Sequence, residues 1–350
     1  MIILEGINIH SIATCVPKNT IDNLEFGEKI FGKDIKKMIK ATGIKERRVC
    51  RDENTSSLDL CVKAAEELFK NNEELKSEIG AVIFVTTSPE YILPNNATLV
   101  QYKLGLSNNI PAFDINLACS GYPFGLWNAA LVCKNLNKKV LLLDGDKQSH
   151  FTSKINKSTA ILFSDIGTAT IVEPTQIKNK WYFSFYTDGS GHEHLMIPHG
   201  GSKKYFSKES LGEYEKNEEK HKYTELYMNG MEIFNFVIKT VPGKVRNLLN
   251  EVNKNIENID FCAFHQANAF MLRLVARDLQ IEESKFPIVI EKYGNSCSSS
   301  VPLTICEHLE KLDNINRNIL VAGFGAGLSI GIGYIEVNNM VNKGVIEYDF

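Results

Sequence analysis

Apolar residues recur at helical spacing between Ser57 and Lys70, where they occupy positions 58, 61, 62, 65, 68 and 69. The hydroxyl of Thr55 or Ser56 can cap the start of this segment, because it can accept a hydrogen bond from a backbone N–H of the first turn. The next apolar run, GAVIFVTT at 80–87, is continuous and rich in β-branched residues. Such a run is typical of a strand that helices cover on both faces. The pattern therefore predicts a helix followed by a buried strand.

Further apolar runs predict buried strands at PAFDINLA (111–118), KVLLLDG (139–145) and NILVAGF (318–324). Segments with helical spacing lie between these runs. This alternation of helices and buried strands favours an α/β fold with mainly parallel sheets and right-handed crossovers.

A weak internal repeat indicates two similar halves. In each half a long helical segment precedes a related strand sequence, IGAVIFVTT at 79–87 and IDFCAFHQA at 259–267. In each half a glycine-bearing turn also enters a strand that ends in glutamate, within 163–173 and 324–336. Self-similarity of this kind is typical of a duplicated unit.

We place the two halves at 1–175 and 176–350, with the junction near 175–225. The segment 201–222 carries many charges of both signs. Such a composition is typical of an exposed excursion. We therefore expect a solvated loop within the second half, the alternative being a docking element.

Charge and composition exclude several classes of protein. The chain has 350 residues, with 39 basic and 42 acidic side chains and a formal net charge of −3. Basic and acidic residues are interleaved along the sequence and form no basic stripe, so nucleic acid is not an expected partner. No apolar run reaches the roughly 18 residues of a membrane span, and the N-terminus lacks the features of a secretion signal, so we expect a cytoplasmic protein. The eight cysteines are scattered through apolar stretches and are expected to be mostly buried thiols.

Cys119 differs from the other cysteines in its position. It follows the strand sequence AFDINLA and opens a helical segment, in which Pro123 is tolerated because first-turn N–H groups lack partners within the helix. A thiol at a helix N-terminus meets the positive end of the helix dipole, which lowers its pKa. Ser120 and Gly121 are small and leave room for a substrate. By position alone a buried structural thiol is an equal alternative.

Two other residues are candidate partners of this thiol. His265 ends the strand sequence DFCAFH and starts the next helical segment, so it lies at the carboxyl end of a strand, where open α/β sheets bind ligands. Its alternative role is to cap that helix. Asn295 lies in the small-residue loop of KYGNSCSSSVPLTI, where its alternative role is to form a turn.

Four motifs together resemble those of the β-ketoacyl-acyl carrier protein synthase III group of the thiolase superfamily. In order, they are DINLACSGYPFGL, FHQANAFML, YGNSCSSSVPL and VAGFGAGLSIG, and the resemblance includes TGIKERR (42–48) and MNGMEIF (228–234). It implies a thiolase-like αβαβα fold with two pseudo-equivalent halves, a homodimer, and no cofactor or metal. It also accounts for the internal repeat.

The resemblance assigns a role to each candidate. Cys119 matches the acyl-accepting nucleophile, and a soft thiolate suits a thioester donor. His265 and Asn295 match the residues that stabilise an enolate after malonyl decarboxylation, as a neutral imidazole N–H and a carboxamide N–H. The backbone N–H groups of Cys119 and Ala326 match a second oxyanion hole. Implied substrate-binding residues are Leu93, Phe234, Asn268 and Gly325.

Other signals have simpler interpretations. The glycine-rich 323–331 joins two strands and does not open a helix, so a dinucleotide site is not expected, and close approach to the acyl cysteine suits it better. The three histidines of 191–199 lack companions at a zinc spacing, so that segment is interpreted as a loop. Cys297 is interpreted as structural filler, the alternative being a second active thiol.

The sequence departs from the family pattern at three places. Lys37 and Ala41 stand where acetyl-CoA-dependent members carry a Trp and an Arg that bind the adenine end of CoA. Leu93 replaces a usually aromatic gate at the dimer interface. Phe270 replaces an expected arginine, although Arg273 and Arg277, four residues apart, share a helical face and could dock an acidic carrier protein.

Three hypotheses follow. The first is a decarboxylating enzyme that takes an acyl group from a CoA or carrier-protein thioester and condenses it with malonyl-acyl carrier protein. The second keeps acylation of Cys119 but passes the acyl group to an amine or hydroxyl. The third is a non-catalytic acyl-binding relative. The sequence leaves open the donor, the chain length and the acceptor.

Overall fold

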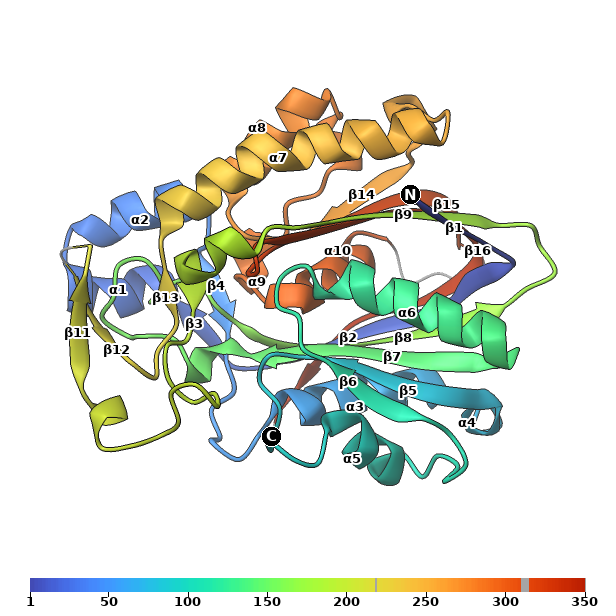
Figure 1. Cartoon of the computed structure of the whole chain (residues 1–350), viewed down its shortest axis with the longest axis horizontal. Coiled ribbons are helices and arrows are strands. Elements are labelled where there is room, and N and C mark those ends of the chain that lie inside the picture. The colour runs from blue at the N-terminus through green and yellow to red at the C-terminus, as the bar shows by residue number, and fades with distance from the viewer. Residues whose placement is uncertain (218, 310–314, 350) are drawn as a thin grey trace.

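The computed structural model describes residues 1–217, 219–309 and 315–349. Ten strands of this described chain form one hydrogen-bonded network, in which the long β16 (Ser329–Tyr348) connects two stacked layers (Figure 1). Helices lie between these layers and outside both of them.

The first layer contains β6 (Ala112–Ile115), β5 (Ile79–Val85), β7 (Lys139–Lys147), β8 (Asp165–Pro174) and β2 (Ile7–Pro17), in this spatial order. Residues 341–348 of β16 pair with the outer side of β2. The neighbours β5 and β7 are parallel, whereas β8 is antiparallel to both β7 and β2.

The second layer repeats this pairing. It contains β14 (Phe261–Phe264), β15 (Ile315–Gly325), residues 329–337 of β16, β9 (Lys180–Thr187) and β1 (Ile2–Glu5). Here β14 and β15 are parallel, and β16 is antiparallel to β15 and β9. The division at 175/176 falls between β8 and β9 and stays our interpretation, since β1 and the end of β16 each join the other half's layer.

Five layers of elements alternate through the molecule (Figure 1). The central helices are α6 (Gly121–Leu136) and α10 (Ser300–His308); α3 (Ser57–Phe69) and α5 (Asn96–Lys103) cover the first sheet layer, and α7 (Gly230–Glu251) and α8 (Ala269–Leu279) cover the second. Ser56 caps α3 in a capping box with Asp59, which confirms the expected helix and its start. The layer order is the one expected.

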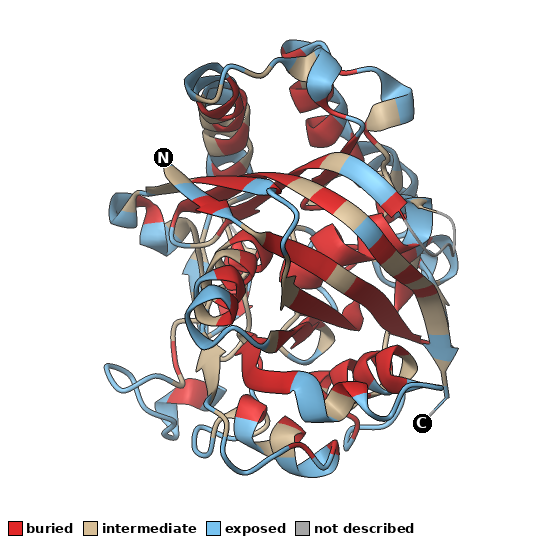
Figure 2. Ribbon diagram, turned by 90° about the vertical axis from the view of Figure 1, so that its right-hand side faces the viewer, coloured by how far each residue is buried: buried red, intermediate tan, exposed pale blue. Residues whose placement is uncertain are grey.

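The hydrophobic core follows these layers. Residues 121–130 of α6 are mostly buried, with Tyr122, Leu126 and Ala129 fully enclosed, as expected for a helix between two sheets, whereas its last turns are largely exposed. A second cluster fills the space between α3 and its sheet, and a third lies beneath α7 and α8. Figure 2 shows the buried residues along the strands and inner helix faces, with exposed residues outside.

Smaller elements gather at one end of the molecule (Figure 1). They are β3 (Thr20–Asp22), α1 (Asn23–Phe31), α2 (Asp34–Thr42), β4 (Glu46–Arg48), β10 (Leu195–Met196), β11 (Glu213–Lys216), β12 (Glu219–Lys222) and β13 (Tyr227–Met228). Of two further short helices, α9 (Ile290–Tyr293) packs against β4, whereas α4 (Leu75–Glu78) leads directly into β5.

The charged segment 201–222 differs from the solvated loop that was expected. Residues 201–209 are exposed, but β11 and β12 then form a hairpin. The Tyr214 ring stacks on Tyr223, with ring centroids 4.8 Å apart, and Glu219 Oε2 accepts a hydrogen bond of 2.7 Å from Asn156. These contacts attach part of the charged segment to residues outside it.

Strand β6 also differs from its prediction. It is shorter than the apolar run 111–118, it forms the edge of its layer, and its four residues are only half-buried. The strand is therefore not covered on all sides as the apolar run suggested.

Within the described chain, none of the helices has the length and apolar composition that a membrane crossing requires.

Candidate active site

Cys119 lies in the short turn between β6 and α6 and is 7% exposed. The hairpin between β15 and β16 passes directly against it. A Cβ atom added to Gly325 would lie 2.7 Å from the Cys119 Cβ, and one added to Gly323 would lie 2.7 Å from the Cys119 carbonyl oxygen. Both distances are too short for real atoms, so only glycine permits this approach. The expected role of 323–331 is confirmed.

His265 follows β14 and reaches the same point. Its backbone N–H donates to the Ala322 carbonyl of β15 at 2.7 Å, which extends the strand pairing and fixes where the side chain starts. The imidazole is 1% exposed, and its ring meets Phe324 edge-on. Its charge and a hydrogen bond from its side chain help to hold the pKa of the Cys119 thiol below its ordinary value, and both residues line the same cavity.

The contacts of the His265 ring favour one tautomer. Nδ1 lies 3.0 Å from the Cys297 carbonyl oxygen and 2.8 Å from Ser300 Oγ. Since a carbonyl oxygen can only accept, Nδ1 is the nitrogen that carries the proton in the neutral ring. Nε2 then carries no proton in the neutral ring, and it becomes a donor only after the ring takes a second proton. A neutral imidazole N–H aimed at an enolate, as the resemblance implied, does not fit this arrangement.

Asn295 is held between two backbone segments. Its N–H donates to the Leu162 carbonyl at 2.8 Å, and its carbonyl accepts from Ser164 at 2.9 Å. Its side-chain Oδ1 accepts from the Cys297 N–H at 2.9 Å. Because this backbone donor identifies the oxygen, the remaining amide group is the N–H₂ donor. Asn295 therefore offers a donor without charge to the cavity that it lines.

A cavity of about 290 Å³ connects these groups to the surface. Cys119, His265 and Asn295 all line it, together with Phe163, Phe234, Asn268 and Gly325, among others. Its polar groups converge in a mainly apolar enclosure, which is the usual form of a small-molecule site. The structure thus brings together the three residues that were predicted to act as a unit.

The hydrogen bond from Cys297, whose Sγ is 3.8 Å away, is the largest influence that holds the pKa of the Cys119 thiol well below its ordinary value. Burial opposes this effect, and the charge of His265 supports it. Other cysteines show the reverse, since burial raises the pKa of Cys15, Cys133 and Cys262 to about 12. Cys119 is therefore the thiolate-like cysteine, as its helix-start position predicted.

The implied substrate-binding residues fall in two groups. Phe234, Asn268 and Gly325 line the cavity, and Asn268 also caps α8 by accepting from the Met271 N–H at 3.1 Å. Leu93 does not line the cavity and is 85% exposed. Its assignment as a gate depends on a second copy of the chain and stays a prediction.

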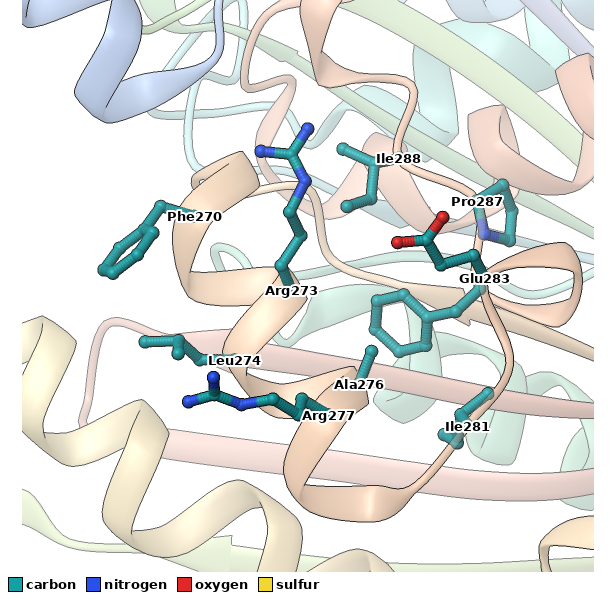
Figure 3. A pocket seen from close by; sticks show the side chains of 10 residues that line it. Phe270, Arg273, Leu274, Ala276, Arg277, Ile281, Glu283, Pro287 and Ile288 are labelled. Carbon is teal, nitrogen blue, oxygen red and sulfur yellow. The ribbon is translucent and has the colours of Figure 1, made fainter.

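Arg273 and Arg277 lie on one exposed face of α8, as expected from their spacing. They border a second hollow of about 660 Å³, with Phe270 at the N-terminal end of the helix (Figure 3). This hollow is larger than the first but contains none of the three candidate catalytic residues. The Phe270 ring stacks on Phe234, which lines the first cavity, so the two hollows are neighbours.

Sequence reasoning missed two parts of the site. Cys297 is buried, as a structural thiol would be, but it contacts the Cys119 sulfur and is therefore not simple filler. Lys157, Ser158, Leu162 and Phe163 also line the cavity, and no residue type among them had suggested this. Within the described ranges no group of three or more His, Cys, Asp or Glu is arranged to hold a metal.

Comparisons with known proteins agree with this geometry. Residues 113–189 match the sequence model described as 3-oxoacyl-[acyl-carrier-protein] synthase III, and residues 249–337 match the model of its C-terminal part. Among similar proteins is the β-ketoacyl-[acyl-carrier-protein] synthase III of Fusobacterium nucleatum, 32% identical over 95% of this chain and 99% of that protein. The protein of that name from Chlamydia caviae is 32% identical over 93% of this chain and 95% of its own.

The likeness extends to the whole fold. The crystal structure of a 3-oxoacyl-(acyl-carrier protein) synthase from Burkholderia xenovorans LB400 superimposes with a TM-score of 0.91 at 33% identity, covering 99% of this chain and 98% of that one. The expected layered architecture is thereby confirmed. The chain belongs to the 3-oxoacyl-[acyl-carrier-protein] synthase III family of the thiolase superfamily.

Proposed function

We propose that this protein joins an acyl group, first loaded onto Cys119, to a malonyl unit carried by acyl carrier protein. The observation that carries the proposal is the meeting of Cys119, His265 and Asn295 at one cavity, with the pKa of the cysteine lowered. A thiolate, a protonatable imidazole and a carboxamide are the groups that such a condensation requires. The family relationship supports the same chemistry.

The reaction proceeds in two halves. The Cys119 thiolate attacks the donor thioester and expels the donor thiolate, leaving an acyl group on its sulfur. Malonyl thioester then loses CO₂, and its enolate carbon attacks the acyl carbonyl, which releases the Cys119 thiolate and a 3-oxoacyl product. Asn295 and protonated His265 stabilise the enolate oxygen, while the backbone N–H groups of Cys119 and Ala326 stabilise the tetrahedral intermediates.

The neutral tautomer of His265 also supports a second candidate. An unprotonated Nε2 beside Cys119 is a suitable base for an amine or hydroxyl acceptor, so transfer without loss of CO₂ is the alternative outcome. Release of CO₂ from malonyl-acyl carrier protein by the acylated enzyme separates the two reactions.

We expect the pure protein to gain the mass of one acyl group when it is incubated with an acyl-CoA or an acyl-acyl carrier protein, before any malonyl thioester is added. The reason is that the thiolate can complete the first half-reaction alone. Intact mass followed by peptide mapping measures the adduct and its position.

A Cys119→Ala variant serves as the control and should gain no mass. A Cys133→Ala variant, which lacks a different buried thiol that lies in α6, should load normally. An adduct on a different cysteine, or none with any acyl donor, contradicts the proposal.

We further propose that acyl carrier protein docks on the α8 face around Arg273 and Arg277. Both side chains are exposed, and within the described chain neither forms an ion pair. The face adjoins the cavity through the stacked rings of Phe270 and Phe234. Two unpaired cations beside a cavity entrance suit an acidic carrier, because complementary charge mainly raises the rate of encounter.

We also propose a homodimer that pairs along β6. This strand is the uncovered edge of its layer, and an unpaired edge is a template for a second chain. Ile92 and Leu93 are each 85% exposed and Tyr102 is 82% exposed, which is unusual for large apolar side chains. A second copy on this side would cover them and bring Leu93 to the partner's acyl channel.

Analytical ultracentrifugation should show a dimer for the unmodified protein. Replacing Ile92 and Leu93 with aspartate should shift it toward a monomer, since two buried charges oppose association. The control replaces Leu211, another leucine that is 83% exposed, with aspartate. This substitution should leave the dimer unchanged. A monomer at all concentrations of the unmodified protein would rule out the proposed pairing.

A further inference from the structure

A second thiol lies next to the proposed nucleophile. Cys297 Sγ is 3.8 Å from Cys119 Sγ, within hydrogen-bonding distance for two sulfur atoms, and Cys297 is 1% exposed. No other cysteine in the described ranges has such a contact with Cys119. The sulfur of Cys297 therefore touches the atom that reacts.

The backbone of Cys297 gives an independent sign that this side chain has a function. Its φ is +56°, in the left-handed region that glycine adopts freely and other residues adopt at a cost. The same residue donates its N–H to Asn295 Oδ1 and accepts from His265 Nδ1 at its carbonyl. Strain at a residue that holds two catalytic side chains is typical of a functional position.

The neighbours of Cys297 determine where its hydrogen points. Gln148 Nε2 lies 3.9 Å from the Cys297 sulfur and can only donate, so the sulfur accepts on that side. Asp146 is a second acceptor near Cys297: its Oδ1 accepts from the N–H and hydroxyl of Thr87 at 2.7 and 2.8 Å, and the carboxylate also forms a hydrogen bond with the Cys297 side chain. The S–H of Cys297 therefore has two acceptors within reach, the Cys119 sulfur and the Asp146 carboxylate.

We propose that Cys297 is a catalytic residue of the acyl-loading step, whose S–H hydrogen bond holds the Cys119 sulfur as a thiolate. The inference rests on the proposed role of Cys119 as the nucleophile. When Cys119 becomes acylated it loses its charge, and the S–H turns to Asp146. When the condensation expels the Cys119 thiolate, the S–H receives it again. No proton is gained or lost by Cys297 in the cycle.

The charges around the sulfur pair are consistent with this role. His265 acts on Cys119 from the end of β14, and Asp146 acts on Cys297 from β7. On the same strand Asp144 accepts from the hydroxyl of the neighbouring Ser298, and Lys157 lines the cavity in an ion pair with Asp34. The contact with Cys119 and burial raise the pKa of Cys297 well above its ordinary value, so this thiol stays protonated. Burial raises the pKa of Asp146 to about 6.

The test measures the rate of Cys119 alkylation by iodoacetamide against pH, with peptide mapping to identify the labelled residue. In Cys297→Gly, which suits the left-handed backbone, the profile should shift to higher pH and the rate at neutral pH should fall about tenfold, the effect of one pKa unit. Cys297→Ser keeps a hydroxyl donor and should remain near the wild-type profile. If the glycine variant does not fold, Cys297→Ala replaces it.

Cys133→Ala is the matched control for loss of a buried thiol, and its profile should not move. An unchanged profile in Cys297→Gly or Cys297→Ala overturns the inference while leaving Cys119 as the nucleophile. Slow labelling of Cys119 in the wild-type protein at every pH would instead contradict the proposed function itself.

Discussion

Replacing His265 with alanine is expected to slow decarboxylation of a malonyl thioester by about 10² to 10³-fold, while loading of Cys119 falls by no more than about tenfold. The enolate oxygen loses its charged donor in the second half-reaction, whereas in the first half-reaction His265 only adds to the lowering of the Cys119 pKa. The Cys119 thiolate keeps the hydrogen bond from Cys297, which is the larger influence on its pKa. Release of ¹⁴CO₂ and the rate of acyl adduct formation measure the two half-reactions separately.

Substitutions of Asn295 separate the loss of the amide donor from the loss of local structure. In Asn295→Asp an oxygen can still accept from the Cys297 N–H, as Oδ1 does at 2.9 Å, but the amide donor is lost. We expect decarboxylation to fall as far as in Asn295→Ala, because the donor and not the local fold is responsible. The control is His199→Ala, which removes a buried histidine that does not line the cavity.

Equal loss of loading and decarboxylation in His265→Ala would have a different meaning. It would make His265 the base that activates Cys119, and it would favour transfer of the acyl group to an amine or hydroxyl. The tautomer indicated by the Cys297 carbonyl makes this outcome chemically possible, so the comparison is decisive.

The core elements could be predicted from the sequence, because a strand that is buried on both faces has a continuous apolar sequence and a packed helix has apolar residues at helical spacing. The apolar run at 80–87 became β5, and the helical spacing after Ser56 became α3. The run at 111–118 was equally apolar, yet β6 is an edge strand. The sequence of one strand does not show which strands lie beside it. Sequence alone therefore could not distinguish a central strand from an edge strand.

The site shows the same limit. Cys119, His265 and Asn295 could be predicted because each lies in a motif whose order along the chain is recognisable. The contact between Cys297 and Cys119 depends on a left-handed turn two residues after Asn295, and no periodicity predicts such a turn at a cysteine. The signal that was present was the unusual run of small residues around it, which permits tight packing.

The second large effect concerns the acyl donor, and it follows from α2. Ala41 lines the cavity, whereas Lys37 is exposed on the outer side of the helix and does not. An aromatic platform and a phosphate-pairing cation are each worth about 1 to 3 kcal/mol. Without them, acetyl-CoA should bind about a hundredfold more weakly than in a member that has both.

Other residues on this side compensate only in part. Lys36 and Lys40 are exposed on α2 and can attract phosphate groups, but they offer no ring for adenine to stack on. Lys157 lines the cavity but is held by Asp34 at 3.0 Å. We therefore expect loading from a carrier-protein thioester, or from an unusual acyl-CoA, to be preferred over acetyl-CoA, and the enzyme to serve a specialised pathway.

The measurement compares rate constants for acylation of Cys119 by acetyl-CoA, longer acyl-CoAs and acyl carrier proteins. A variant with Arg273 and Arg277 changed to glutamate should load more slowly from carrier proteins and at an unchanged rate from acyl-CoA, because only the protein donor uses the α8 face. Reversing the charge of Arg246, which is already paired with Asp278, is the control. Fast, saturable loading by micromolar acetyl-CoA would show that CoA recognition is intact despite Lys37 and Ala41, and would assign the enzyme to ordinary priming of fatty-acid synthesis.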